Sequence, residues 1–231
     1  MATAVLAGST GLVGNQILTH LLAHPSIAQI HAYTRRDLPN PSGSTKFLPI
    51  NSPTPPTWPS LFPNSTTPPP KILLSALGTT RAQAGSIAAQ RAIDYQLNLD
   101  LAAAAKAAGV EVYVLISSSG ANSAAYLAYP RMKGELEDGV KKLGFKHTVI
   151  LRPGLIVGER VESRPAEAAL RWVARGLGGV SYKAVDWWAQ DAGVIGRAAV
   201  EAGVRCLEGK RGEGVWEVGM GEIVELGRKR E

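Results

Sequence analysis

Three kinds of side chain in the middle of the sequence have the types and spacing needed for acid–base chemistry at a carbonyl group. The segment "LISSSGANSAAYLAYPRMK" begins with apolar residues, continues with a run of serines, and then carries Tyr129 and Lys133, four residues apart. Residues at this spacing lie on one face of a helix, a single turn from each other. We expect the serines at the carboxyl end of a strand and the other two residues on the helix that follows.

A tyrosine needs help to act as an acid–base catalyst, because the pKa of a free phenol lies near 10. A nearby cation stabilises the phenolate, and Lys133 supplies that charge. We therefore predict that Tyr129 gives a proton to a carbonyl oxygen as hydride arrives at the carbon. Ser118 is predicted to hydrogen-bond the same oxygen, with Ser119 as the alternative, whereas Tyr126 has no lysine at the same spacing.

A glycine triplet between a strand and a helix at the start of the chain predicts a dinucleotide-binding turn. In "AVLAGSTGLVGNQIL", Gly8 permits a tight exit from the strand, Gly11 leaves room for a pyrophosphate, and Gly14 lets the helix lie close to the sheet. The helix N-terminus offers free amides and the positive end of its dipole to the phosphates. The predicted contacts from this turn, with hydroxyl donors on its serine and threonine, are Gly8, Ser9, Thr10, Gly11, Leu12, Val13 and Gly14.

The end of the second predicted strand selects the cofactor. An NAD site places a carboxylate about twenty residues past the glycines, where it binds the ribose 2′-hydroxyl. Here that place holds Arg35 and Arg36, and guanidinium groups bind a 2′-phosphate through paired, charge-assisted hydrogen bonds. Asp37 is the competing carboxylate, although it could cap a turn instead. We predict NADP(H), with further contacts from the "SALGTTR" segment at Leu77, Gly78 and Thr79.

Strands alternate with helices along most of the chain. Strand patterns cover residues 2–8, 27–36, 45–50, 71–77, 110–119, 147–154 and 214–218. Helical patterns cover residues 12–22, 88–109, 130–144, 165–176 and 189–207, and a last helix starts at Met220. This alternation predicts the α/β class: a Rossmann-type doubly wound parallel sheet with helices on both faces and a small C-terminal substrate lobe.

The 231 residues are predicted to form a single domain. Residues 1–151 make the cofactor-binding core, and 152–231 supply the substrate lobe and the C-terminal elements. Eleven of the fifteen prolines lie in a proline-rich insert at 39–70. Proline lacks an amide hydrogen and clashes within a helix, so this connection cannot be a normal long helix. We expect a surface meander, with one helical turn around 58–62.

Composition excludes several classes of protein. No apolar run reaches the roughly 18 residues of a membrane helix. Neither a secretory signal nor a matrix presequence is recognisable, since the first arginine is Arg35. The formal charge is +6 and the pI is near 9.5, which suits a phosphate-rich cofactor. The basic residues are scattered without interleaved aromatic residues, so no specific nucleic-acid partner is predicted.

Metal and thiol chemistry are not expected. His20 and His24 are four residues apart on a predicted helix, but no third ligand follows at a suitable spacing. Cys206 is the one cysteine, which excludes an internal disulfide and a thiolate cluster. It is predicted to be a buried, inert thiol in a reducing compartment.

The motifs "GSTGLVG", "SSSGA" and "YPRMK" resemble those of the short-chain dehydrogenase/reductases, in their extended or atypical branch. More closely, "LGTTR", "SSSGA", "YPRMKGELE", "LRPGLIVGER" and "ESRP" are similar to the Tat-interacting-protein group of atypical members, and within it to the fungal mitochondrial branch. The resemblance covers nearly the whole chain. Its clearest departure is the proline-rich insert, which puts the nearby edge of the sheet in doubt but not the site.

This resemblance implies an NADPH-bound Rossmann fold, with Tyr129 as proton donor and Lys133 holding both the ribose and the tyrosine. It places Arg164 near the cofactor and Asn98 at the helix asparagine that supports a proton relay. It also implies a peripheral protein of the mitochondrial outer membrane; otherwise the sequence would be placed in the cytoplasm. The segment that builds the substrate pocket in related folds holds Trp172, Trp187 and Trp188, for which packing is the alternative.

The sequence therefore predicts an NADPH-dependent reductase of a small, apolar carbonyl compound. The alternative is a catalytically weak NADPH-binding regulator whose occupancy controls association with a protein partner or a membrane. The proline-rich insert and the basic tail "GRKRE" favour this second hypothesis. The two differ in whether a broad panel of carbonyl compounds is turned over.

Overall fold

The computed structural model describes residues 1–38, 43–157 and 189–228. Four residues singled out in the sequence, Arg164, Trp172, Trp187 and Trp188, lie outside these ranges, as does the helix predicted over 165–176. Their predicted roles therefore stay predictions.

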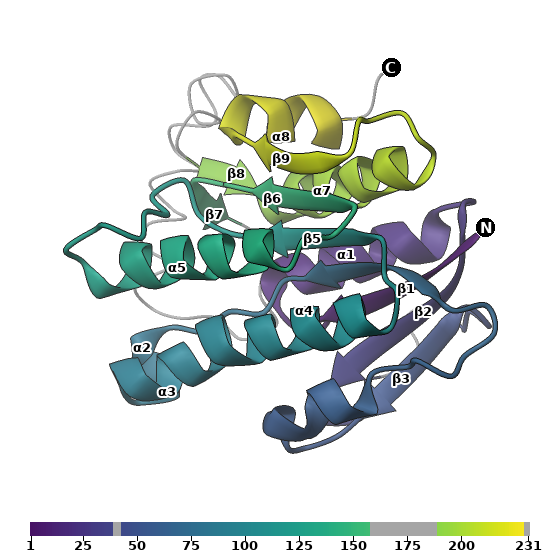
Figure 1. Cartoon of the computed structure of the whole chain (residues 1–231), viewed down its shortest axis with the longest axis horizontal. Helices are drawn as coiled ribbons and strands as arrows, with labels where there is room; N and C mark the ends of the chain where they lie inside the picture. Colours follow the sequence, from purple (N-terminus) through teal and green to yellow (C-terminus); the bar gives the residue numbers. More distant parts are fainter. Residues whose placement is uncertain (39–42, 158–188, 229–231) are drawn as a thin grey trace.

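A seven-stranded parallel sheet forms the centre of the molecule (Figure 1). Its strands are β1 (Ala2–Ala7), β2 (Ile27–Thr34), β3 (Phe47–Asn51), β4 (Pro70–Ser75), β5 (Val112–Ile116), β6 (His147–Leu151) and β9 (Gly214–Val218). Their order across the sheet is β3-β2-β1-β4-β5-β6-β9, and every pair is parallel. The chain thus winds outward from β1 in both directions, which confirms the predicted doubly wound α/β class.

Helices cover both faces of this sheet (Figure 1). One face is covered by α1 (Leu12–Ala23), α7 (Ala192–Leu207) and α8 (Met220–Gly227). Their buried residues form one apolar cluster with the alternate side chains of the strands, among them Leu6, Ile72 and Val114. The other face is covered by α4 (Asn98–Ala107) and α5 (Ala128–Lys142), which bury Val5, Leu73 and Leu115 in a second cluster. Strands buried on both faces explain why these segments read as continuous apolar runs.

The long helix predicted over 88–109 is interrupted. It is built from α3 (Ile87–Arg91), a π-helical turn η2 (Ala92–Leu97) and α4, and it is preceded by the short α2 (Arg81–Ala84). A π turn holds one residue more than an α turn, and such turns occur frequently at functional sites. The alanine-rich pattern gives no sign of this irregularity, because apolar periodicity changes little across one widened turn.

Residues 43–70 of the proline-rich insert pack as a structured part of the fold. Its strand β3 forms the edge of the sheet beside β2, and the connection to β4 contains only the 3-10 helix η1 (Pro55–Leu61). Trp58 of η1 stacks on Tyr33 with ring centroids 5.1 Å apart, and the Tyr33 hydroxyl donates to the Trp58 carbonyl over 3.0 Å. As predicted, proline keeps a long helix out of this crossover, and the expected turn at 58–62 starts three residues earlier.

The C-terminal elements largely complete the main sheet. Strand β9 pairs with β6, and α7 packs against both α1 and α8. A separate two-stranded sheet joins β7 (Leu155–Val157) to β8 (Ala189–Asp191). The helix predicted over 189–207 accordingly starts at Ala192, where Asp191 caps it by accepting a hydrogen bond from the Gly193 amide over 2.8 Å.

Helix α1 approaches the end of β1 unusually closely at Gly14. A Cβ atom on this residue would lie 1.9 Å from the carbonyl oxygen of Gly8, well inside contact distance. Gly8 itself has a φ of +86°, and a Cβ there would lie 2.6 Å from the carbonyl oxygen of Ala76. The turn after β1 therefore tolerates no side chain at either position.

We predict that Gly14→Ala lowers the free energy of unfolding by about 3 kcal/mol or more, because the backbone must separate to admit one methyl group. Urea denaturation followed by circular dichroism measures this change. The matched control is Gly221→Ala in α8, where a Cβ would meet nothing within 4 Å. The control should change stability by between zero and about +1 kcal/mol through helix propensity. Equal stability of the two variants would contradict the close approach.

Candidate active site at the carboxyl edge of the sheet

The strand order reverses between β1 and β4, and this defines a crevice at their carboxyl ends. The chain leaves β1 toward one neighbour and β4 toward the other, so the two following turns open away from each other. The turns are joined directly, because the Ala76 amide donates to the Ala7 carbonyl over 2.9 Å. The glycine turn and the "LGTT" loop, which the sequence analysis placed at one cofactor, therefore share this edge.

The N-terminus of α1 faces this crevice with unsatisfied donors. Gly11 is its N-cap and provides no side-chain cap, and the first turn holds no acidic residue. The amides of Leu12 and Val13 are thus among those that no helix carbonyl can accept. A Cβ on Gly11 would meet only the Gly8 carbonyl, at 3.2 Å. An open approach, free amides and the positive end of a helix dipole suit a phosphate group.

Ser9 has a different role from the one predicted for its hydroxyl. Its side chain is fully buried and donates to the carbonyl of Tyr33 on β2 over 2.9 Å. This bond fixes the glycine turn to the neighbouring strand. Thr10, by contrast, is exposed. A hydroxyl contact to a phosphate would therefore come from Thr10 and not from Ser9.

The two arginines after β2 are free to bind a ligand. Arg35 and Arg36 are both exposed, and neither makes a hydrogen bond or an ion pair with another described residue. One oxygen of the competing carboxylate is already bound: Asp37 Oδ1 accepts a hydrogen bond from the Asn51 amide over 2.6 Å. Asn51 is the last residue of β3, so Asp37 is held toward the edge of the sheet.

The three serines after β5 point to different partners. Ser117 is buried and its hydroxyl donates to Glu137 of α5. Ser118 is half-buried, and its side chain interacts with Tyr129 so as to lower the pKa of the phenol. Ser119 is exposed, and its amide donates to the Pro153 carbonyl over 2.8 Å. The structure therefore brings Ser118 to Tyr129 and uses its two neighbours to fix the loop.

Tyr129 and Lys133 lie one turn apart in α5, which begins two residues earlier than predicted. Tyr129 remains 44% exposed, whereas Lys133 is 4% exposed and donates from Nζ to the Ile116 carbonyl over 3.2 Å. Tyr126 is fully exposed and faces solvent. The geometry thus separates an accessible phenol from a buried ammonium group behind it.

The pKa of Tyr129 is raised, whereas the sequence analysis expected Lys133 to stabilise the phenolate and so to lower it. Partial burial of the phenol raises this pKa, the negative charge of Asp94 raises it further, and the interaction with Ser118 lowers it. Burial lowers the pKa of Lys133, while Asp94 and Glu137 raise it. In the structure without a ligand, Tyr129 therefore stays protonated at neutral pH. This state suits a proton donor and not a base.

A buried ionic network behind α5 was missed by the sequence analysis. Glu137 is almost fully buried, and it accepts hydrogen bonds from Ser117 and from the guanidinium of Arg152. Arg152 also pairs with Glu217 of β9 over 2.7 Å. Because Glu137 lies one turn beyond Lys133, this network fixes the helix face that carries the site. Its partners are distant in sequence, so no local motif could reveal it.

Gly134 is a second feature that the sequence analysis passed over, although it follows Lys133 in "YPRMKGELE". A Cβ there would lie 2.1 Å from the Ser123 amide and 2.3 Å from the carbonyl carbon of Asn122. The loop over 117–127 thus rests directly on α5 at this glycine. This loop projects from the sheet edge between β5 and α5 (Figure 1).

Asn98, which the family resemblance placed in a proton relay, is fully buried where η2 meets α4. Its amide donates to the carbonyls of Ile93 and Asp94 over 3.2 Å and 3.1 Å, and its carbonyl accepts from the Ser75 hydroxyl. These bonds satisfy backbone carbonyls in the widened turn. The side chain of Asn98 therefore supports the helix beside the site.

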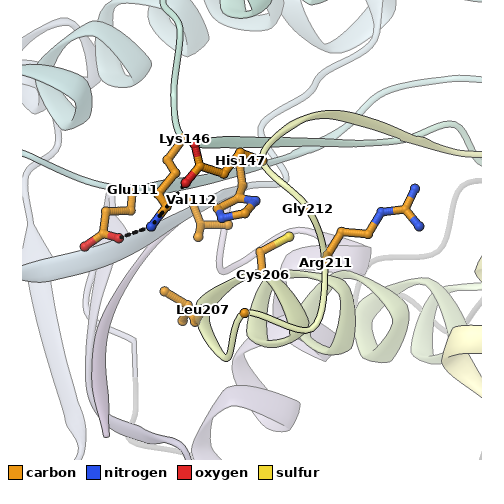
Figure 2. A pocket seen from close by; sticks show the side chains of 10 residues that line it. Glu111, Val112, Lys146, His147, Cys206, Leu207, Arg211 and Gly212 are labelled. Carbon is orange, nitrogen blue, oxygen red and sulfur yellow. Dashed lines mark ion pairs between the residues drawn. The ribbon is translucent and has the colours of Figure 1, made fainter.

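A pocket of about 270 Å³ lies at the opposite, amino edge of the sheet (Figure 2). It is lined by the starts of β5 and β6 and by the end of α7, with His147 and Cys206 facing each other across it. Burial raises the pKa of the Cys206 thiol to about 11, so the thiol is protonated at neutral pH. This pocket is remote from the residues predicted to do chemistry.

The described ranges lack the features of two other classes of site. In residues 1–38, 43–157 and 189–228, no group of three or more His, Cys, Asp or Glu side chains is arranged to hold a metal ion. Over the same residues, no helix combines the length and the apolar character needed to cross a bilayer.

The sequence matches known proteins over its full length. A family model described as HIM1 matches residues 65–175. "Protein fmp52, mitochondrial" from Aspergillus fumigatus is 49% identical, with 100% of both chains covered. "Protein fmp52-1, mitochondrial" from Aspergillus oryzae is 50% identical and 98% of each chain is covered, and "Protein fmp-52, mitochondrial" from Neurospora crassa is 45% identical over 98% of this chain and 96% of the other.

Solved structures share the fold at low sequence identity. A UDP-glucuronic acid 4-epimerase from Bacillus cereus in complex with NAD superposes with a TM-score of 0.66 at 14% identity, covering 94% of this chain and 76% of that one. MoeE5 in complex with UDP-glucose and NAD gives a TM-score of 0.67 at 18% identity, covering 97% and 80%.

The parallel sheet and the glycine turn, together with the solved structures that share this arrangement, define a Rossmann-type α/β protein. Within that class, the chain belongs to the fmp52 family of fungal proteins.

Proposed function

We propose that the protein is an NADPH-dependent oxidoreductase that reduces the carbonyl group of a small, apolar compound. The observation that carries this proposal is the placement of Tyr129 and Lys133 one turn apart in α5, with the Ser118 side chain acting on the exposed phenol and the ammonium of Lys133 buried. A donor pair of this kind at the carboxyl edge of a doubly wound sheet lies where such folds bind ligands.

The residues of the site have separable roles in such a reduction. Bound NADPH would supply the hydride. Tyr129 donates its phenolic proton to the carbonyl oxygen, and its raised pKa keeps that proton in place until the oxygen becomes basic. Ser118 donates a hydrogen bond to the same oxygen as negative charge develops there. Lys133 would hold the cofactor ribose. The positive charge of its ammonium group stabilises the phenolate that forms when Tyr129 has lost its proton.

An apolar substrate is favoured by exposed apolar side chains on the segments that follow β5 and β6. Leu127 is 72% exposed and precedes the catalytic tyrosine by two residues, and Leu155 at the start of β7 is 40% exposed. Large apolar side chains exposed in this way are suited to contact an apolar ligand.

NADPH is favoured over NADH by the chemistry at the end of β2. Arg35 and Arg36 offer two guanidinium groups that have no partner among the described residues. Asp37, which would bind the ribose hydroxyls of NADH, has its Oδ1 held toward β3 by Asn51. The cofactor complexes of the structural neighbours, which contain NAD, support a nicotinamide dinucleotide in general.

The double variant Arg35→Ala/Arg36→Ala tests this choice. We expect its affinity for NADPH to fall roughly 10- to 100-fold, because charge-assisted hydrogen bonds to the 2′-phosphate are lost. Its affinity for NADH should stay within about twofold, and isothermal titration calorimetry measures both. The control is Arg205→Ala, whose guanidinium pairs with Glu201 near the far end of α7. Equal losses for the two cofactors would contradict the proposed contact.

Replacing Tyr129 tests the chemical step separately. We expect Tyr129→Phe to bind NADPH as the wild type does and to lose at least about 100-fold in kcat/KM, since general acid catalysis contributes that much. A spectrophotometric screen of carbonyl compounds that follows NADPH oxidation measures turnover. Tyr126→Phe is the matched control, because that side chain faces solvent.

The outcome of the screen also distinguishes the two functions predicted from the sequence, the reductase and the NADPH-binding regulator. Turnover that survives in Tyr129→Phe would remove this residue from the mechanism. If the wild type binds NADPH but turns over no compound in the panel, the NADPH-binding regulator becomes the better account. That protein would then be expected to capture a protein partner only when NADPH is bound.

We propose a mitochondrial location, since the relatives with nearly full coverage carry that word in their names. Peripheral attachment to the outer membrane is the finer proposal, and it follows from the family resemblance. Alkaline carbonate extraction of isolated mitochondria should release the protein into the supernatant, and protease added to intact mitochondria should degrade it. Retention in the pellet or full protection would contradict this placement.

A further inference from the structure

Asp94 is a buried carboxylate that the proposed mechanism does not use. It lies within the π turn η2 and is 1% exposed. One of its oxygens, Oδ1, accepts a hydrogen bond from the Thr79 amide over 2.7 Å, and the other accepts from the Gln90 amide over 3.4 Å. Gln90 also donates to the Thr79 carbonyl over 3.0 Å. Both backbone groups of Thr79, in the predicted cofactor loop, are thus held from the helix that carries Asp94.

The turn η2, which carries this carboxylate, packs against α5, the helix that carries the catalytic pair. The charge of the carboxylate acts on both Lys133 and Tyr129. The charged groups that bear on Lys133 are Asp94 from η2 and Glu137 from α5 itself. Glu137 is already bound by Arg152, so its charge is largely matched. Lys133 is the cation that acts on Asp94, which makes these two groups each other's main counter-charge.

Burial makes this pairing necessary. An isolated charge is expensive to bury, and removing one member of a buried pair leaves the other uncompensated. Burial raises the pKa of Asp94, whereas Lys133 and the hydrogen bonds from Thr79 and Gln90 lower it. For Lys133 the effects are reversed in sign, with burial lowering its pKa and Asp94 raising it. Each group therefore favours the charged form of the other.

The π turn gives this arrangement its geometry. A widened turn breaks the regular hydrogen-bond ladder of the helix. The side-chain amide of Asn98 donates hydrogen bonds to the carbonyls of Ile93 and Asp94 instead. A regular α-helix would need no such side chain at this point. The irregular turn is thus maintained by a dedicated buried amide, at the residue that joins the cofactor loop to α5.

We propose that Asp94 is a positioning residue that couples the cofactor loop to the catalytic pair, holding the Thr79 amide with one oxygen while its charge balances Lys133. Its catalytic consequence rests on the proposed function, but the coupling itself does not. Binding of a dinucleotide against the loop at Thr79 would thereby act through Asp94 on the charge of Lys133, the residue paired with Tyr129.

The test is the protonation of Lys133 measured without any substrate. In protein labelled with ¹³C at the lysine Cε, NMR follows each ammonium group as a function of pH, and the signal of Lys133 is assigned by its absence in Lys133→Met. We expect Asp94→Asn to lower the titration midpoint of Lys133 by at least about one pH unit, a tenfold loss in proton affinity. Asp94→Glu, which keeps the charge, should recover most of it.

The matched control is Asp100→Asn in α4, an exposed carboxylate that accepts from Gln96 over 2.8 Å on the same helical segment. It should leave the midpoint of Lys133 within about 0.2 units of the wild type. A folded Asp94→Asn protein with an unchanged midpoint would overturn the proposal.

A reciprocal measurement covers the case in which Asp94→Asn does not fold. In Lys133→Met the carboxyl signal of Asp94, labelled with ¹³C, should titrate at a higher pH than in the wild type, since coupled groups shift together. An unchanged titration of Asp94 would overturn the proposal as firmly.

Where turnover is found, the pH profile of kcat should shift with the Lys133 midpoint in Asp94→Asn. A shifted midpoint in a protein without turnover would leave the coupling intact and refute only the proposed reductase.

Discussion

The contact between Gly14 and the carbonyl of Gly8 is the constraint on which the rest of the site depends. It sets how close α1 can come to β1, and the same turn is pressed against the loop after β4 at Ala76. Because both loops are fixed to each other, the free amides of α1 and the "LGTT" loop border one crevice. A single methyl group at this point would move the N-terminus of α1 away from β1.

Behind the crevice, buried charge organises the chemistry. Two carboxylates act on the charge of Lys133, Asp94 from the π turn and Glu137 from its own helix, and each is tied by hydrogen bonds to a different part of the fold. Asp94 reaches the "LGTT" loop, whereas Glu137 reaches Ser117 and Arg152. Buried ion pairs add little net stability, but they fix orientation because every polar atom must find its partner. The site therefore obtains its geometry from electrostatic satisfaction as much as from apolar packing.

Much of the fold and the outline of the site could be read from local sequence. Apolar runs, the glycine triplet and the Tyr129/Lys133 spacing depend on neighbouring residues, and they gave the sheet, the turn and the helix that carries the pair. The absence of a long helix from the insert could be predicted because proline lacks an amide hydrogen and clashes within a helix. Three features were not readable: the hydroxyl of Ser9 is used by Tyr33, Glu137 is matched by Arg152, and Asp94 lies in a widened turn. Each depends on a partner brought close only by the folded sheet, or on one extra residue in a helix whose apolar pattern hides it.

The most direct measurement is a crystal structure of the chain with NADPH. The account predicts the pyrophosphate over Gly11 and the amides of Leu12 and Val13, the 2′-phosphate between Arg35 and Arg36, and the nicotinamide beside Tyr129. A dinucleotide bound at another edge of the sheet, or one whose adenosine ribose is held by Asp37 with both arginines turned away, would contradict it.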